Sequence, residues 1–199
     1  MKTLRTITIL IFLLPLVSVW GQTILAPKAG MTFSKMTGYD DVRPKDFYSK
    51  PGILVGLMAK KRVINRFDIQ LDFSFLEKGT NKGFLQVPDS YVEKVKLYYL
   101  DVQLAFSYAL SDWLSAEAGY FVAYNMKTKY KVNSWSGSSW YDDDRNFRYK
   151  DFDQGPVFGL SGYYKKFQLG MRFLPSLKNK EGAYTNQTFA LSLGYLFEI

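Results

Sequence analysis

The sequence predicts an all-β fold: an eight-stranded antiparallel up-and-down transmembrane β-barrel, preceded by a cleavable signal peptide. Three observations support this prediction. Apolar and polar residues alternate with a period of two in eight segments, long and short connections alternate between them, and the first residues have the pattern of an export signal. After residue 22 no stretch is apolar over the ~20 residues that a membrane-spanning helix needs.

The N-terminal segment has the features of a secretory leader. Lys2 and Arg5 supply the positive start, and residues 7–19 are almost wholly apolar. This run is shorter than the ~20 residues of a spanning helix, which argues against the alternative of a single membrane anchor. Small residues place the cleavage between Gly21 and Gln22. The expected units are therefore a signal peptide over 1–21 and a barrel domain over 22–199.

The clearest predicted strand covers residues 67–75, where five apolar residues alternate with four polar ones. Because successive side chains of a strand point to opposite faces, one face of this strand is apolar and the other is polar. Seven other segments alternate in the same way. The eight predicted strands are residues 28–34, 53–59, 67–75, 98–108, 114–124, 155–164, 167–173 and 188–197.

The connections support a membrane barrel independently of the strands. Long and short connections alternate, so with both termini in the periplasm every short link falls on the periplasmic side, as in bacterial barrels. The predicted connections are residues 36–50, 60–66, 76–93, 110–113, 126–152, 165–166 and 174–187.

The apolar face is predicted to meet lipid. It carries Phe, Tyr and Leu on nearly every strand, more bulk than the interior of an eight-stranded barrel can hold, whereas the other face is rich in small and polar residues. A soluble periplasmic barrel that binds an apolar ligand would turn the same face inward, and it is the less favoured alternative. Two aromatic belts are expected, with Tyr108, Trp113, Tyr164, Phe167, Tyr195 and Phe197 near the short turns and Phe33, Phe75, Tyr98, Tyr124, Phe173 and Phe189 near the long loops.

The composition limits the partners and the chemistry. The formal net charge is +8, but the basic residues are scattered, so we expect anionic lipid of the outer membrane as a partner and no nucleic acid. The chain has no histidine and no cysteine, which removes the commonest general base and any disulfide. We therefore expect no catalytic site, no cofactor and no metal site, and a monomer.

The C-terminus carries a short motif with the pattern polar-x-Gly-x-x-aromatic-x-hydrophobic. It resembles the terminal signal by which the barrel-insertion machinery recognises its precursors during assembly. Its residues are Ser192, Gly194, Phe197 and Ile199.

Residues 99–124 and 153–163 resemble the PorT-like outer-membrane β-barrel family, whose barrels are of the OmpA/OmpX-like eight-stranded kind. The chain departs from the family pattern at Asp101, where a Glu is typical, and at Gln103, where a Pro is typical. The resemblance implies localisation in the cell outer membrane; a few relatives serve in protein secretion and most have no assigned activity. The residues that match are Tyr99, Leu100, Glu117, Ala118, Gly119 and Tyr120.

Four charged residues are predicted to face the lumen, namely Lys28, Asp101, Glu117 and Arg172. Their functional interpretation is a polar plug or a proton or ion site. The structural interpretation is a core of paired charges, and it is favoured because desolvated charges must be paired.

The segment 126–152 is a candidate recognition loop, with Trp135, Trp140 and Tyr141 among many charges. A hairpin that extends the fifth and sixth strands above the membrane is equally compatible. The sequence thus favours a barrel without enzymatic activity, with a structural role or a protein partner bound through its extracellular loops. A small-solute or ion channel is the second hypothesis.

Overall fold

The structure is a computed structural model that describes residues 23–38, 49–81, 86–87, 90–134, 137–142, 152–177 and 184–199. The predicted cleavage site at Gly21 and Gln22 lies outside these residues, as does Trp135. Within the described ranges there is no helix with the length and apolar character needed to cross a membrane.

The described chain forms a single sheet of 11 strands. In chain order they are β1 Thr23–Gly38, β2 Lys50–Ile64, β3 Phe67–Asn81, β4 Gln86–Val87, β5 Ser90–Ala109, β6 Leu114–Ser134, β7 Gly137–Asp142, β8 Phe152–Tyr164, β9 Phe167–Pro175, β10 Tyr184–Tyr195 and β11 Phe197–Glu198.

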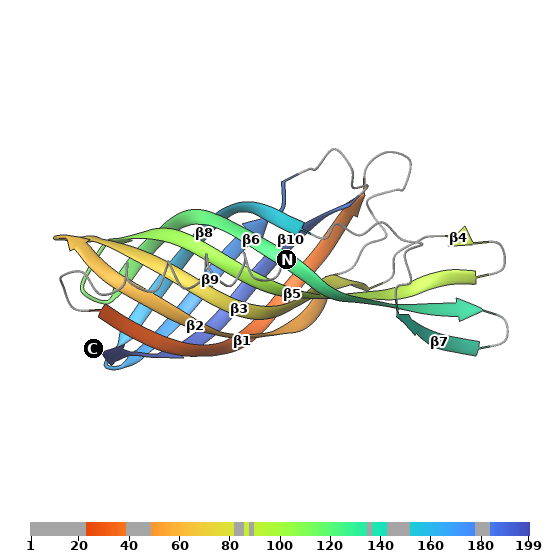
Figure 1. The fold of residues 1–199 in the computed structure, drawn as a ribbon, viewed down its shortest axis with the longest axis horizontal. Coiled ribbons are helices and arrows are strands. Elements are labelled where there is room, and N and C mark those ends of the chain that lie inside the picture. Colours follow the sequence, from red (N-terminus) through yellow and green to blue (C-terminus); the bar gives the residue numbers. More distant parts are fainter. Residues whose placement is uncertain are drawn as a thin grey trace, which may run out of the picture.

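The sheet closes on itself into a barrel (Figure 1). Its strands follow the order β4-β5-β3-β2-β1-β10-β9-β8-β6-β7, and an additional pairing of β5 with β6 joins the two ends. The wall therefore consists of eight antiparallel strands, β1, β2, β3, β5, β6, β8, β9 and β10, which confirms the predicted fold. The short strand β11 continues β10 and pairs with β1.

Several wall strands are longer than the alternation predicts, and two of them, β5 and β6, extend far beyond the wall at the long-loop end (Figure 1). β5 begins at Ser90 and β6 runs to Ser134, so both extend into segments that were predicted to be long connections. A register shift between Tyr98 and Tyr99 leaves Met126 as an extra residue on β6. A bulge of this kind changes which residues share a face, so the period-two pattern stops there although the strand continues.

Bulky apolar side chains cover the outside of the barrel wall. Phe73, Leu104 and Leu193 are 45%, 50% and 54% exposed, whereas their chain neighbours Asp72 and Gln103 are buried. This orientation confirms the prediction that the apolar face points outward, and it contradicts a soluble barrel with an apolar interior. Aromatic rings pair at both ends of the apolar band: Phe67 with Tyr108 near the short turns (4.8 Å), and Tyr124 with Phe152 near the long loops (5.3 Å).

Candidate functional site

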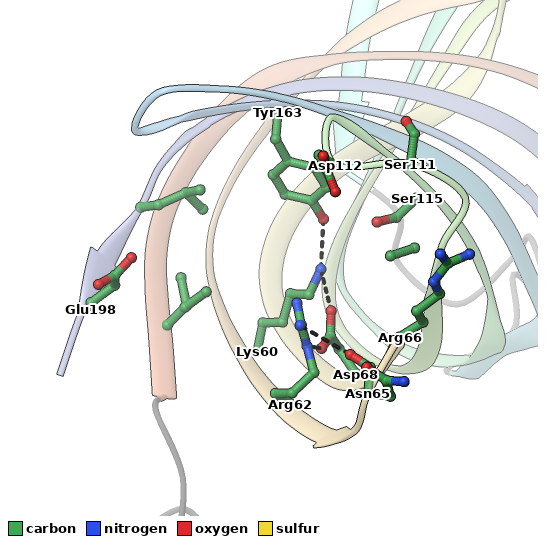
Figure 2. A pocket seen from close by; sticks show the side chains of 13 residues that line it. Lys60, Arg62, Asn65, Arg66, Asp68, Ser111, Asp112, Ser115, Tyr163 and Glu198 are labelled. Carbon is green, nitrogen blue, oxygen red and sulfur yellow. Dashed lines mark hydrogen bonds and ion pairs between the residues drawn. The ribbon is translucent and has the colours of Figure 1, made fainter.

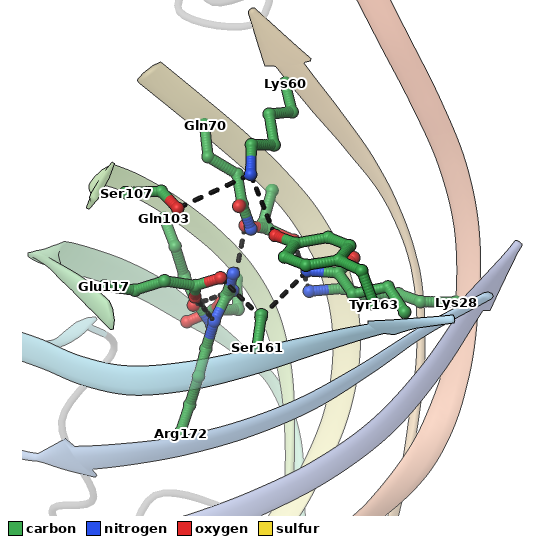
Figure 3. A network of polar contacts seen from close by, with 12 residues as sticks. Lys28, Lys60, Gln70, Gln103, Ser107, Glu117, Ser161, Tyr163 and Arg172 are labelled. Atoms are coloured by element: carbon green, nitrogen blue, oxygen red, sulfur yellow. Dashed lines mark hydrogen bonds and ion pairs between the residues drawn. The ribbon is translucent and has the colours of Figure 1, made fainter. Parts of the chain in front are cut away.

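A buried ion-pair network fills the lumen at mid-height (Figure 3). Arg172 on β9 extends across the barrel to Asp72 on β3, with 2.8 Å between Nη1 and Oδ2. Its Nε also donates to Glu117 Oε2 on β6, at 2.8 Å. Because β3 and β9 are four strands apart in both directions around the wall, the Arg172 side chain bridges the full width of the lumen.

Asp72 has several further partners. It forms a second ion pair, with Lys28 on β1, and Gln70 Nε2 donates to its Oδ2 at 2.8 Å. Two cations thus face two carboxylates, Asp72 and Glu117, and all four side chains are buried or nearly so. Buried charges are tolerated when they are paired and hydrogen-bonded in this way.

Gly159 on β8 makes room for the Arg172–Glu117 pair. It lies between Glu117 and Arg172 in the sheet register. A Cβ atom at this position would lie 2.9 Å from Arg172 Cγ and 3.2 Å from Glu117 Oε2. The missing side chain therefore lets the flanking strands bring arginine and glutamate together.

The structure brings three of the four predicted lumen charges, Lys28, Glu117 and Arg172, into one network of ion pairs. In the part of the chain that the structure describes, Asp101 is linked to this network only through Gln103, whose Oε1 accepts from Arg172 Nη1 at 2.8 Å. Asp101 is fully buried, and Gln103 Nε2 donates to its Oδ1 at 2.6 Å. Among the described residues it has no ion pair, and its Oδ2 has no hydrogen-bond partner. Asp72, the centre of the network, is not among the predicted lumen charges, although the alternation in residues 67–75 places it on the polar face of its strand.

An apolar cap closes the lumen above this network, towards the long loops. The alternation predicts small and polar residues throughout the lumen, so this apolar layer differs from the prediction. Lys78 is enclosed within the cap, with its Nζ 4.5 Å from the centre of the Phe121 ring and 2.8 Å from Asp153 Oδ2. The buried residues of the cap are Met36, Leu76, Val95, Leu97, Tyr99, Phe121, Ala123, Val157 and Leu174.

Below the network, at the short-turn end, the lumen widens into a cavity of about 550 Å³ (Figure 2). Lys60 crosses it, donating to Tyr163 Oη at 2.8 Å and pairing with Asp68 Oδ2 at 2.8 Å. In the described part of the chain, no three His, Cys, Asp or Glu side chains are grouped as a metal ion would require. Most of the residues that line the cavity are polar or charged, so it is a polar vestibule at this end of the lumen.

At the opposite end β5, β6 and β7 continue beyond the barrel wall as an arm (Figure 1). β6 and β7 form an antiparallel hairpin in which Lys131 faces Trp140 and Tyr130 faces Tyr141. Trp140 and Tyr141 are each 48% exposed, and Tyr141 stacks on Tyr130 with ring centres 5.6 Å apart. Of the candidate recognition loop, the described part is thus a hairpin that also exposes aromatic side chains.

The C-terminal motif lies at the short-turn end. Phe197 and Ile199 are exposed, and the Phe197 ring packs edge-on against Tyr195 with 4.8 Å between ring centres. The Ile199 backbone N–H donates to the Thr23 carbonyl at 2.9 Å, which ties the end of the chain to β1. Ser192 and Gly194 lie on β10, on the side that faces the lumen.

The fold agrees with comparisons to known proteins. The chain is similar to the attachment invasion locus protein Ail of Yersinia pestis (15% identity, TM-score 0.51, covering 89% of this chain and 99% of Ail). It is similar to the same protein solved with the heparin analogue sucrose octasulfate (16% identity, TM-score 0.50, covering 89% and 99%), and to Neisserial surface protein A (12% identity, TM-score 0.48, covering 87% and 97%).

At the level of sequence, a comparison with curated proteins finds no significant match. The family described as outer membrane protein beta-barrel domain, in contrast, matches residues 24–180, which is most of the chain. The chain therefore belongs to the outer membrane protein beta-barrel domain family and is a protein of the bacterial outer membrane.

Proposed function

We propose that this protein is a non-enzymatic outer-membrane barrel with an occluded lumen, and that it acts as a structural element or binds a partner through the arm outside the cell. The observation that carries this proposal is the filling of the lumen. A cross-barrel ion-pair network and an apolar cap lie one above the other along the axis. The interior of an eight-stranded barrel is just wide enough for side chains to fill it.

The filling favours this proposal over an ion channel. A solute that entered from the vestibule would have to displace Arg172 from Asp72 and Glu117, and then pass Tyr99 and Phe121 in the cap. Breaking a buried ion pair costs about 3–5 kcal/mol, because it leaves an uncompensated charge in a low dielectric. Frequent spontaneous opening is therefore not expected.

Planar-bilayer recording tests the occlusion. The folded barrel should give no stable open events under conditions in which a general porin, inserted as a positive control, conducts. A separate check shows that the inserted barrel is folded: its gel mobility should differ between boiled and unboiled samples of the same preparation. Stable conductance steps from the unaltered chain would contradict the proposal and support the channel hypothesis.

A partner-binding role is supported by the exposed aromatic residues of the arm. Trp140 lies on the side of the hairpin that continues the outer face of the wall. Tyr141 lies on the opposite face, where it presents an exposed side chain suited to protein contacts. A photo-crosslinking residue at position 141 in intact cells should give a defined protein adduct, whereas the same residue at Trp113, exposed in a short turn, should not give that adduct. No protein adduct at position 141 would leave only the structural role.

Within the family, we place this chain with the PorT-like barrels, on the motif residues of 99–124 and 153–163. Tyr99 and Glu117 of that motif are buried in the lumen, which is consistent with a structural reason for the motif. We further propose export by a signal peptide and a monomeric state in the membrane. N-terminal sequencing of the mature protein should start at Gln22, and the mass of the detergent complex should correspond to one chain.

A further inference from the structure

We propose that the lysine-rich outward side of the arm binds the phosphate groups of anionic lipids in the leaflet that surrounds the long-loop end. This inference rests on the proposed placement of the arm outside the cell. We call this surface the lysine face. Its residues are Lys94 and Lys96 of β5 and Lys127, Lys129 and Lys131 of β6.

The sheet register gathers these lysines on one side. Lys94 lies opposite Lys131, and Lys96 lies opposite Lys129. Residues that oppose one another in an antiparallel pair share a face. Between the β5 lysines, Val95 points into the apolar cap and is buried, so the lysines point outward.

Carboxylates on the arm compensate for only part of this charge. Lys131 pairs with Glu93 at 2.7 Å, whereas Lys127 and Lys129 share Asp142, at 2.9 and 3.8 Å. Lys94 has no ion pair within the described part of the chain. Like charges that oppose each other across two strands destabilise the sheet, so the excess positive charge favours an anionic ligand.

The remaining carboxylate near the face is already engaged. Glu77 lies 3.8 Å from Lys96 Nζ, but it also pairs with Lys50 at 2.5 Å. Lys96 therefore shares its only carboxylate neighbour among the described residues with another cation. A phosphate would supply the missing negative charge without displacing an existing pair.

The height of the lysine face corresponds to the lipid headgroups. On β5 the outward positions run from Tyr98, whose ring stacks on Phe75, directly to Lys96 and Lys94. With about 3.3 Å per residue and a strand tilt near 40°, these lysines lie roughly 5 and 10 Å above the aromatic belt. The interfacial layer on each side of the hydrocarbon core is of similar thickness, on the order of 5–8 Å.

Trp140 supports this placement. Its ring lies 5.2 Å from Lys96 Nζ, on the same outward side of the hairpin. Tryptophan favours the membrane interface, where its ring contacts apolar groups while its N–H stays hydrated. Because the lysine face continues the lipid-facing side of the wall, its neighbour is the surrounding leaflet rather than a soluble polyanion above the barrel.

The test is lipid binding by the full-length barrel in a neutral detergent, measured by native mass spectrometry. The probe is lipid A, with its two phosphates, titrated beside the same glycolipid without phosphate. The test variant is Lys94→Gln/Lys96→Gln/Lys129→Gln, which leaves the closest ion pairs of Lys127 and Lys131 in place. The matched control, Lys61→Gln/Lys165→Gln/Lys166→Gln, removes the same charge at the short-turn end.

We expect the test variant to bind lipid A at least about tenfold more weakly than the unaltered chain, since each lysine near an anionic surface contributes a factor of about five. The control variant should retain binding, and so should a variant with arginine in place of Lys94, Lys96 and Lys129. The glycolipid without phosphate should bind all variants and the unaltered chain equally. Heat-induced gel mobility shows that each variant is folded.

Two results would overturn the inference. One is equal lipid A affinity in the test variant, the control and the unaltered chain. The other is that a soluble sulfated polysaccharide binds preferentially through these lysines, while lipid A binds no better than the same glycolipid without phosphate. Neither result bears on the occlusion of the lumen, which the bilayer recordings test separately.

Discussion

Arg172 on β9 and Asp72 on β3 meet across the full width of the barrel, 2.8 Å apart although 100 residues separate them in the chain. The pair connects opposite sides of the wall, and Lys28 attaches a third strand to the same carboxylate. Backbone hydrogen bonds join each strand only to the strands that lie beside it in the sheet. These side chains therefore add the direct links between strands that are not adjacent.

Replacing Asp72 should cost much more stability than replacing Asp101. Asp72→Asn removes the carboxylate that faces two cations and should lower the free energy of unfolding by about 3 kcal/mol, since it leaves buried positive charge uncompensated. Asp101→Asn keeps the Oδ1 acceptor for Gln103 and breaks no ion pair, so a loss below about 1 kcal/mol is expected. Denaturant titrations of refolded barrel measure both; equal losses would contradict the assigned network.

Gly159→Ala should disturb the Arg172–Glu117 pair. The new methyl group would lie 2.9 Å from Arg172 Cγ and displace the guanidinium, with an expected cost of about 1–3 kcal/mol. Gly162→Ala is the matched control on the same strand, because its Cβ would have no neighbour closer than 3.9 Å. Its stability should change by less than about 1 kcal/mol. If both variants lose the same stability, crowding at position 159 is not the cause.

Both layers of the lumen should have to be removed before the barrel conducts. Arg172→Ser opens the ion-pair network but leaves Tyr99 and Phe121 in the cap, and Tyr99→Ala/Phe121→Ala does the reverse. Each variant alone should remain closed in planar bilayers, whereas the combination should give stable open events. Conductance from the single Arg172→Ser variant would show that the cap does not seal the lumen.

The carboxylates of the arm should titrate at lower pH than isolated ones. Lys131 Nζ donates to Glu93 at 2.7 Å, which holds the pKa of Glu93 below its ordinary value of 4.5. A lowered pKa in the folded state means that the pair stabilises the arm above pH 4.5 and that this stabilisation is lost as the pH falls through the lowered pKa. The effect should be small and should shrink with salt, because the pair is partly exposed to solvent.

Carboxyl ¹³C shifts followed by NMR during an acid titration measure this midpoint. In Lys131→Gln the Glu93 midpoint should rise towards 4.5. Lys127→Gln, the control, should leave Glu93 unchanged and instead raise the pKa of Asp142, which Lys127 lowers by a hydrogen bond of 2.9 Å. A Glu93 midpoint that is insensitive to Lys131 would mean that this ion pair does not form in solution.

Phe197 should matter for assembly beyond its contribution to stability. Phe67 provides a matched control: both rings are about half exposed at the short-turn end, and each has an aromatic partner at 4.8 Å. Phe197→Ser and Phe67→Ser should refold spontaneously into vesicles at similar rates. With the barrel-insertion machinery present, only Phe197→Ser should assemble more slowly; equal slowing of both would remove the proposed signal.

The sequence by itself determined the strand number, the order of short turns and long connections, and which face of each strand meets lipid. These features follow from local alternation, because the two faces of a strand lie in different solvents. The alternation in residues 67–75 was sufficient to assign Phe73 to the outside and Asp72 to the inside. It was not sufficient beyond Tyr124 on β6, where the extra residue Met126 shifts the register.

Only the tertiary structure decided which lumen residues meet. The partner of Asp72 depends on closure of the ring, on the register of every intervening pair and on strand tilt, none of which is encoded in a local pattern. For the same reason Glu117 finds Arg172, while Asp101 finds only Gln103. The lysine face likewise became visible only when the β5–β6 pairing placed lysines from two distant segments side by side, where the bulge had hidden their common orientation.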